Sequence, residues 1–414
     1  MEKLYFEFLQ IAIGNRKSLS AAIHDSDWLR LFEFCKKQAL IGVGFTAVEK
    51  LHTLGVECPA NLRMQWMALA LLIEKRNALL NEQCKKLTEQ YWHDGLLTCI
   101  LKGQGNCLNY PEELRKRRQC GDIDIWATTI NDEGLRINNN GIAIAVQTGR
   151  NEAEYVEYYG RKAVIEYVKM LHRLVGNNEK PLIRYHHIEA PKMDETEVEV
   201  HFRVGFLNSP LRNWRMQRWF DNHADVCMKN KTQMGFAVPT SSVNVVYQMC
   251  HLFSHYFDEG LGLRQLMDYY FALRVWHNDV MECKDLQSQG MWREGLGTPV
   301  MSATGIMAVL RSFGMGKFAA AVMYVLHKAF AMPTHYCICE PNEKEGRKLL
   351  AEIMQGGNFG QYDTRDAALK KGGMMKHAVW KLKRVMRLVS SYPEEALWEP
   401  VFRVYHLLWR GING

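Results

Sequence analysis

Two aspartates separated by one apolar residue constrain the fold of this chain more than any other feature. Asp122 and Asp124 lie in the run Gly121-Asp122-Ile123-Asp124-Ile125-Trp126, whose Ile and Trp residues predict a β-strand. Because side chains alternate along a strand, the two carboxylates share one face and the isoleucines share the other. Two acids on one face repel each other unless water, a basic group or a cation lies between them. Mg²⁺ is the common cation where phosphates are handled.

A second predicted strand also carries acids. The segment from Thr196 to Arg203 alternates between polar and apolar residues, which is typical of a strand with one buried face. Its open face holds Glu197, Glu199 and His201, whereas Val198, Val200 and Phe202 face a core. Glu197 lies closer to the polar turn and is expected to face solvent, so we expect Glu199 to join the aspartates. We expect His201 either to contact a metal or, as we favour, to form hydrogen bonds within the sheet.

A glycine turn precedes the first acidic strand. Residues 96–101 form a short apolar strand that ends at Lys102, and Gly103-Gln104-Gly105 follows. Glycines let backbone N–H groups approach phosphate oxygens closely, although an ordinary turn explains the pair equally well.

These residues resemble a bacterial family of uncharacterised nucleotidyltransferases within the DNA polymerase beta-like nucleotidyltransferase superfamily. The resemblance covers about residues 96 to 206, and its motifs are Leu101-Lys102-Gly103, Tyr110-Pro111, Arg118, Asp122-Ile123-Asp124 and Glu199-Val200-His201. Two positions depart from the pattern. Gln104 stands where the superfamily usually has Ser or Gly, and Glu199 stands where Asp is frequent.

The resemblance implies a function and a set of site residues. It implies a metal-dependent nucleotidyltransferase that moves a nucleoside monophosphate from an NTP, with ATP as the expected donor, to a hydroxyl acceptor and releases pyrophosphate. Asp122, Asp124 and Glu199 would be both catalytic residues and ligands of Mg²⁺ or Mn²⁺. The nucleotide would be bound by Lys102, Gly103, Gln104, Gly105 and Arg118. The acceptor stays open between RNA, a protein and a small molecule.

The whole sequence predicts an α+β fold in which a small mixed β-sheet nucleotidyltransferase core is flanked by largely α-helical N- and C-terminal regions. We expect a helical region at residues 1–95, the core at 96–210 and a second helical region at 211–414. A long helix is expected from Pro59 to Trp92, and an amphipathic helix from Arg161 to Val175. Leu182–Ile188 and Thr196–Phe202 are predicted to form an antiparallel pair joined by a turn at residues 191–195.

Composition sets the wider limits. No apolar run reaches the roughly 18 residues of a membrane span, and no signal region is evident, so we expect a cytoplasmic protein. The 11 cysteines lack paired metal-ligand spacing and are expected to be free thiols. A formal net charge of +7 permits a polyanionic substrate without demanding one.

Three further clusters have less specific interpretations. The basic run Arg115–Arg117 is either a solvated patch or part of the nucleotide site. His251 and His255 are spaced like a helical metal pair, but the sequence shows no third ligand. Arg264 and Asp268 are predicted to form a helix-surface pair. The family resemblance implies the alternative, in which Asp268 packs the helical region against the core.

A basic amphipathic helix is predicted from Lys376 to Leu388. We expect it to cover the core with Val379, Leu382, Met386 and Val389 and to keep its cations in water, although such helices also bind RNA or anionic membranes. Together with Gln104, this helix supports the alternative function, a non-catalytic nucleotide- or RNA-binding protein on the same fold.

Overall fold

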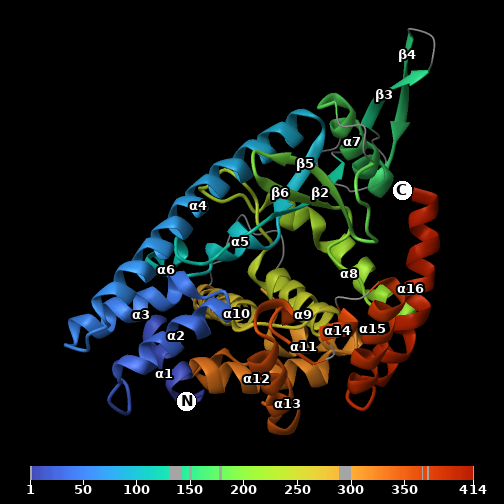
Figure 1. Cartoon of the computed structure of the whole chain (residues 1–414). Coiled ribbons are helices and arrows are strands. Elements are labelled where there is room, and N and C mark those ends of the chain that lie inside the picture. Colours follow the sequence, from blue (N-terminus) through green and yellow to red (C-terminus); the bar gives the residue numbers. More distant parts are fainter. Residues whose placement is uncertain are drawn as a thin grey trace.

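The computed structural model describes residues 2–129, 142–148, 152–176, 180–288, 300–365, 367–370 and 373–413. It has the predicted fold class, a small mixed sheet with helices before and after it (Figure 1). The N-terminal helices are α1 (Glu2–Ala12), α2 (Asp25–Lys37), α3 (Ile41–Thr53) and α4 (Ala60–His93). The long helix α4 confirms the prediction from Pro59 to Trp92. Its sequence lacks glycine and internal proline, so nothing interrupts the helix.

The central sheet has four strands in the order β1-β2-β6-β5. They are β1 (Leu96–Ile100), β2 (Ile123–Thr129), β5 (His187–Met193) and β6 (Thr196–His201), and short helices α5 (Gly103–Cys107) and α6 (Glu112–Arg115) connect the first two. Strands β2 and β6 are parallel, whereas the other neighbours are antiparallel. The mixed sheet therefore places the two acidic strands side by side at its centre.

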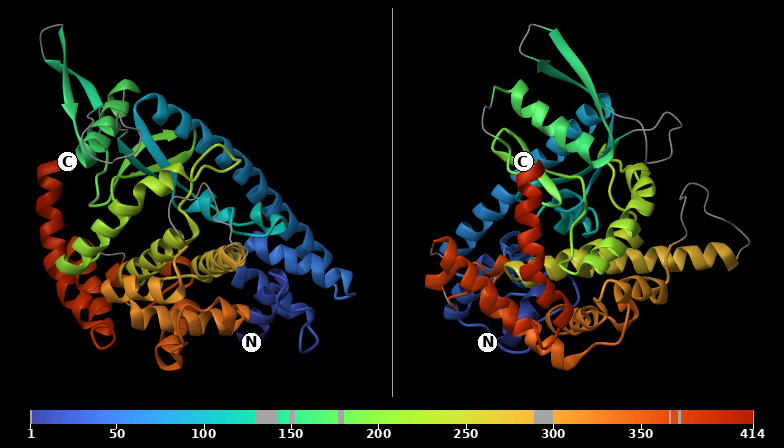
Figure 2. Two further views of the ribbon diagram at one scale, coloured as in Figure 1. Left: turned by 180° about the vertical axis from the view of Figure 1, so that it is seen from behind. Right: turned by 90° about the vertical axis from the view of Figure 1, so that its right-hand side faces the viewer.

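The connection between the central strands adds a ribbon and a helix. Strands β3 (Ile142–Thr148) and β4 (Glu152–Tyr158) form a separate antiparallel pair, which projects from the body in every view (Figures 1 and 2). Helix α7 (Gly160–Leu174) follows and confirms the predicted amphipathic helix.

The C-terminal region is largely helical in its described part. Its helices are α8 (Pro210–Lys229), α9 (Ser241–Asp258), α10 (Leu263–Ser288), α11 (Ala303–Ser312), α12 (Gly316–Phe330), α13 (Glu343–Gly356), α14 (Ala367–Lys370), α15 (Met374–Leu388) and α16 (Pro393–Asn413). None of the helices in the described ranges is both long and apolar enough to cross a membrane.

The two faces of the sheet have different neighbours. Ile123 and Ile125 of β2 and Val200 of β6 pack in one apolar cluster with residues of α4 and α7. Cys99 and Trp126 face the other way and join a larger cluster that contains residues of α1, α3, α9, α10 and α12. That second face also carries the acids, so the helical regions close over it.

The predicted hairpin of β5 and β6 is antiparallel as expected, but its position along the chain was wrong. Strand β5 begins at His187 rather than Leu182 and includes Pro191, and the turn lies at Asp194 and Glu195. Proline is tolerated there because β5 is an edge strand, and the register shifts between Ala190 and Met193. Asp194 adopts a positive φ of 53°, which a short turn requires.

The face predicted for the basic helix α15 was also wrong. Val379, Leu382 and Met386 are exposed, and Val389 is half-buried. The buried stripe consists of Trp380, Arg384, Val385 and Leu388. A cation lies inside this stripe because Arg384 donates hydrogen bonds to the carbonyls of Tyr256 and Phe257 at the end of α9.

Candidate active site

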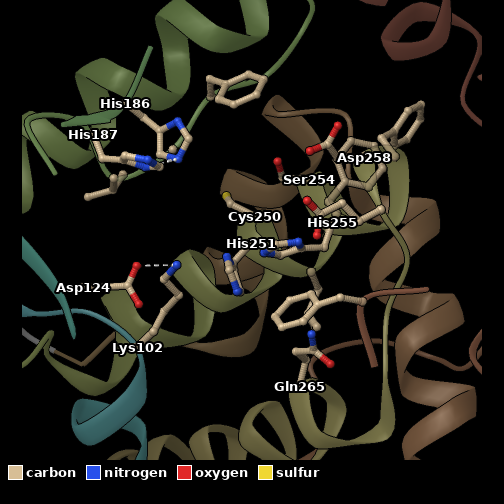
Figure 3. A pocket seen from close by; sticks show the side chains of 18 of the residues that line it. Lys102, Asp124, His186, His187, Cys250, His251, Ser254, His255, Asp258 and Gln265 are labelled. Carbon is tan, nitrogen blue, oxygen red and sulfur yellow. Dashed lines mark hydrogen bonds and ion pairs between the residues drawn. The ribbon is translucent and has the colours of Figure 1, made fainter. Parts of the chain in front are cut away.

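The acid-bearing face of the sheet forms one wall of a cavity of about 920 Å³. Asp122, Asp124 and Glu199 lie on this wall, as do Lys102 and Gly103. The opposite side is lined by α9, with His251, His255 and Asp258, and by residues of α15 and α16 (Figure 3). The sheet and the C-terminal helices therefore share one site.

The strand register brings two of the three predicted acids together. Asp124 of β2 and Glu199 of β6 are direct partners in the parallel ladder, so their side chains leave the sheet on the same face. Asp122 lies immediately before β2 and lines the same cavity. Glu197 is also on this face, but it is exposed and pairs with Lys192 at 3.3 Å near the hairpin turn.

Asp124 is the most tightly held of the acids. Its Oδ1 lies 2.5 Å from Lys102 Nζ and 3.0 Å from His201 Nε2, and only 2% of the residue is exposed. Burial opposes ionisation, but Lys102 and His201 outweigh it and hold the pKa of Asp124 well below its usual range. Asp124 is therefore a carboxylate near neutral pH. His201 forms the hydrogen bond within the sheet that we favoured from the sequence.

The pKa of Asp122 shifts in the opposite direction. The charge of Asp124 and then burial raise the pKa of Asp122 above its ordinary value, although Lys102 partly compensates. For Glu199, burial is outweighed by hydrogen bonding to His201, and its pKa is lowered. Uncompensated repulsion therefore remains at Asp122, whereas Asp124 and Glu199 are stabilised as carboxylates.

The glycine turn has a packing explanation. Gly103 has a φ of +43°, and a Cβ at Gly105 would lie 2.6 Å from the carbonyl oxygen of Ile100. Both positions therefore need glycine so that α5 can begin directly after β1. Gly103 lines the cavity, whereas the Gln104 side chain points to α4 and donates to the Asn77 carbonyl and to Asn81 Oδ1.

Arg118 joins the loop before β2 to helix α10. Its guanidinium donates two hydrogen bonds of 2.7 Å to Asp268 of α10, and Tyr110 donates a third at 2.6 Å. All three side chains are buried. The predicted surface pair of Arg264 and Asp268 was therefore wrong, because Asp268 joins the helical region to the core and Arg264 donates to the carbonyl of Gln119.

The basic run before Arg118 takes part in intramolecular contacts. Arg117 bonds to Glu74 at 2.8 Å and also to Glu49, and Lys116 pairs with Glu74 at 3.3 Å. These contacts hold the loop before β2 against α3 and α4.

Sequence reasoning missed two histidines of the site. His186 and His187 lie on the cavity wall beside Glu199, and burial lowers the pKa of His187 to about 3. The His-His doublet was visible in the sequence. Its place next to Glu199 followed only from the hairpin register, which the sequence did not reveal.

The match to known proteins agrees with this geometry. A family model described as an uncharacterised nucleotidyltransferase matches residues 24–291. The chain belongs to this family. This membership confirms the resemblance found in the sequence and supports nucleotidyl transfer as the general chemistry of the chain. No curated protein and no solved structure matches the chain.

The matched range includes most of the elements that form the site. It begins just before α2 and extends past the end of α10, so it includes the six strands of the described ranges and Asp268. The family pattern thus covers the acids, their sheet and the helix that Arg118 holds. Helices α15 and α16, which complete the cavity wall, lie beyond it.

Proposed function

We propose that the chain is a metal-dependent nucleotidyltransferase that transfers a nucleoside monophosphate from an NTP, ATP in the first instance, to a hydroxyl acceptor. One observation carries the proposal. Asp124 and Glu199 are register partners on neighbouring parallel strands, and with Asp122 they line a cavity of about 920 Å³. That volume accommodates a nucleotide together with part of a second substrate.

The donor set fits a hard divalent cation. Carboxylate oxygens are the ligands that Mg²⁺ and Mn²⁺ prefer, and a cation would relieve the repulsion that raises the pKa of Asp122. Asp122, Asp124 and Glu199 would hold the metal. When bound, such ions polarise the acceptor hydroxyl and neutralise charge on the triphosphate and the leaving pyrophosphate.

Other residues of the wall would handle the phosphates. Lys102 Nζ is paired with Asp124 and lines the cavity, so it can turn to a phosphate oxygen once a cation neutralises that carboxylate. Gly103 offers a backbone close to the same point. Arg118 is fully engaged with Asp268 and would act as a positioning residue that keeps the loop before β2 in place.

The reaction then has a defined balance. The acceptor oxygen forms a bond to the α-phosphorus while the bond from that phosphorus to the bridging oxygen of the β-phosphate breaks. Pyrophosphate leaves with the electron pair, and the hydroxyl proton passes to a carboxylate of the cluster and then to solvent.

Gln104 and the basic helix, which favoured a non-catalytic protein, both make intramolecular contacts. The Gln104 side chain is bound to α4 and does not line the cavity. In the basic helix, Lys381 pairs with Asp258 and Arg384 with backbone carbonyls, so two of its cations serve contacts within the fold. We therefore favour the enzyme.

A labelling experiment tests the proposal. The protein is incubated with each α-labelled NTP, Mg²⁺ or Mn²⁺ and a cell extract, and the molecule that carries the label is identified as RNA, protein or small molecule. We expect Glu199→Gln to abolish labelling and Glu197→Gln to leave it intact, because the Glu197 side chain is exposed beside the hairpin turn. No metal-dependent label with any NTP, or equal loss in both variants, would contradict the proposal.

A further inference from the structure

Three histidines gather on the cavity wall beside Glu199. His187 and His201 are cross-strand partners in the antiparallel pair of β5 and β6, so both rings leave the sheet on the acid-bearing face. His186 directly precedes β5, and its ring contacts both others, with ring centroids 4.4 Å from His187 and 5.4 Å from His201. His186 and His187 point into the cavity in Figure 3.

Several pairs of possible ligand atoms lie close together here, and the three histidines also meet as one group. His186 Nε2 lies 3.0 Å from His187 Nδ1, and Glu199 Oε2 lies 3.4 Å from His187 Nδ1 and 3.5 Å from His201 Nε2. A tetrahedral ion with bonds of about 2.0 Å needs ligand pairs about 3.3 Å apart. One ligand atom from each histidine can be chosen so that the three lie within 4.8 Å of one another.

Each of the three rings also has one nitrogen without a hydrogen-bond partner among the described residues. His186 Nδ1, His187 Nε2 and His201 Nδ1 are buried and have no hydrogen-bond partner among the described residues. Buried polar atoms are rarely left in this state, and a ring flip can present either nitrogen to the cluster. Only 4% of His187 and 1% of His201 are exposed, so water does not readily satisfy them.

We propose that His186, His187 and His201 bind one transition-metal ion of the Zn²⁺ class, at a site next to the oxygen-ligand site of Asp122, Asp124 and Glu199. Imidazole nitrogens select borderline ions such as Zn²⁺ and Co²⁺, whereas Mg²⁺ prefers oxygen. Glu199 lies 3.4 Å from His187 and 3.5 Å from His201, and Asp124 lies 3.0 Å from His201, so the two sites are adjacent.

Spectroscopic titration of the full-length chain without nucleotide tests this site. After treatment with a chelator, the protein is titrated with Co²⁺, and the visible d–d bands of four-coordinate Co²⁺ are followed. We expect one equivalent to bind, Zn²⁺ to displace it and excess Mg²⁺ to leave it in place. His186→Gln and His187→Gln should each weaken Co²⁺ binding by about tenfold or more.

His251→Gln is the matched control, because His251 is a cavity histidine on α9 outside the cluster. It should bind Co²⁺ as the unaltered chain does, and circular dichroism verifies that each variant is folded. His186 is half-buried and precedes the strand, so His186→Gln remains informative if His187→Gln does not fold.

Two results would overturn the inference: no Co²⁺ bands in the unaltered protein, or equal weakening by His251→Gln and His186→Gln. The titration contains no NTP and is therefore independent of the proposed function. Co²⁺ binding without nucleotide transfer would contradict only the transferase, and transfer without Co²⁺ binding would contradict only this site.

Discussion

Asp122 and Asp124 are two residues apart and chemically identical, yet their surroundings move their pKa values in opposite directions. Lys102 and His201 stabilise the charge of Asp124 against burial. That charge then becomes the largest cause of the raised pKa of Asp122. The repulsion between the acids is thus concentrated on Asp122. A cation bound beside Asp122 would relieve most of it.

The metal-free Asp122→Asn variant should be more stable than the unaltered chain at pH 8. A carboxyl whose folded pKa is raised binds protons more readily in the folded state, so stability is lost as pH rises through the folded pKa. The gain should therefore shrink as pH falls through the folded pKa and be smallest below the unfolded pKa of about 3.9, where Asp122 is protonated in both states. Differential scanning fluorimetry in a chelator should show a higher Tm for the variant at pH 8.

Mg²⁺ provides the second half of this test. It should raise the Tm of the unaltered protein with ATP present and have little effect on Asp122→Asn. An equal Mg²⁺-dependent shift in both proteins would count against Asp122 as a ligand.

Helices and strands whose form depends on their own residues could be predicted from the sequence pattern. The length of α4 follows from an uninterrupted series of helix formers, and the faces of β2 and β6 follow from strict alternation. The amino-acid sequence alone was therefore enough to assign the acids to one surface. The pairing of β5 could not be predicted in this way, because an edge strand accepts Pro191 and a shifted register.

Helix α15 shows the same limit. Its apolar stripe predicted one buried face, but tertiary contacts select another. Arg384 satisfies carbonyls at the end of α9, a need that no pattern within residues 374–388 reveals. The place of His186 and His187 beside Glu199 escaped prediction for the same reason, since it depends on contacts between elements.

Two leucines of α15 give a matched test of its orientation. Leu388 is 7% exposed and packs in the larger apolar cluster, whereas Leu382 is 52% exposed. Leu388→Ala should lower the free energy of unfolding by about 2–5 kcal/mol, and Leu382→Ala should change it by less than about 0.5 kcal/mol. Urea denaturation of both variants decides the matter, and the reverse ranking would mean that α15 presents the face first predicted.

Considered as a whole molecule, the chain builds its site from segments far apart in the sequence. The cavity is lined by residues of the loop after β1, of β2 and β6, and of α9, α15 and α16. Several of these are histidines kept neutral inside the fold. Burial lowers the pKa of His255 to about 3 and also holds the pKa of His251 well below its usual range.

Acidification should therefore weaken the whole fold. A histidine with a lowered folded pKa contributes stability that is present above its unfolded pKa of about 6.5 and is lost as pH falls toward the folded value. Protonation linked to His255 should lower the free energy of unfolding by up to about 2 kcal/mol between pH 7 and pH 5. Urea midpoints at the two pH values should differ less in His255→Gln, and an unchanged difference would contradict the neutral buried ring.

The contact between Arg118 and Asp268 joins the sheet to the C-terminal helices and lies near the wall that carries the acids. Both side chains are about 4% exposed, so removing one charge leaves the other buried without a partner. Asp268→Asn should therefore lower the free energy of unfolding by about 3–5 kcal/mol. Asp225→Asn, which loses only an (i, i+4) pair with Lys229 on α8, should cost less than about 1 kcal/mol. Urea denaturation measures both, and equal small losses would show that Arg118 finds other partners and that the sheet does not depend on α10 for its position.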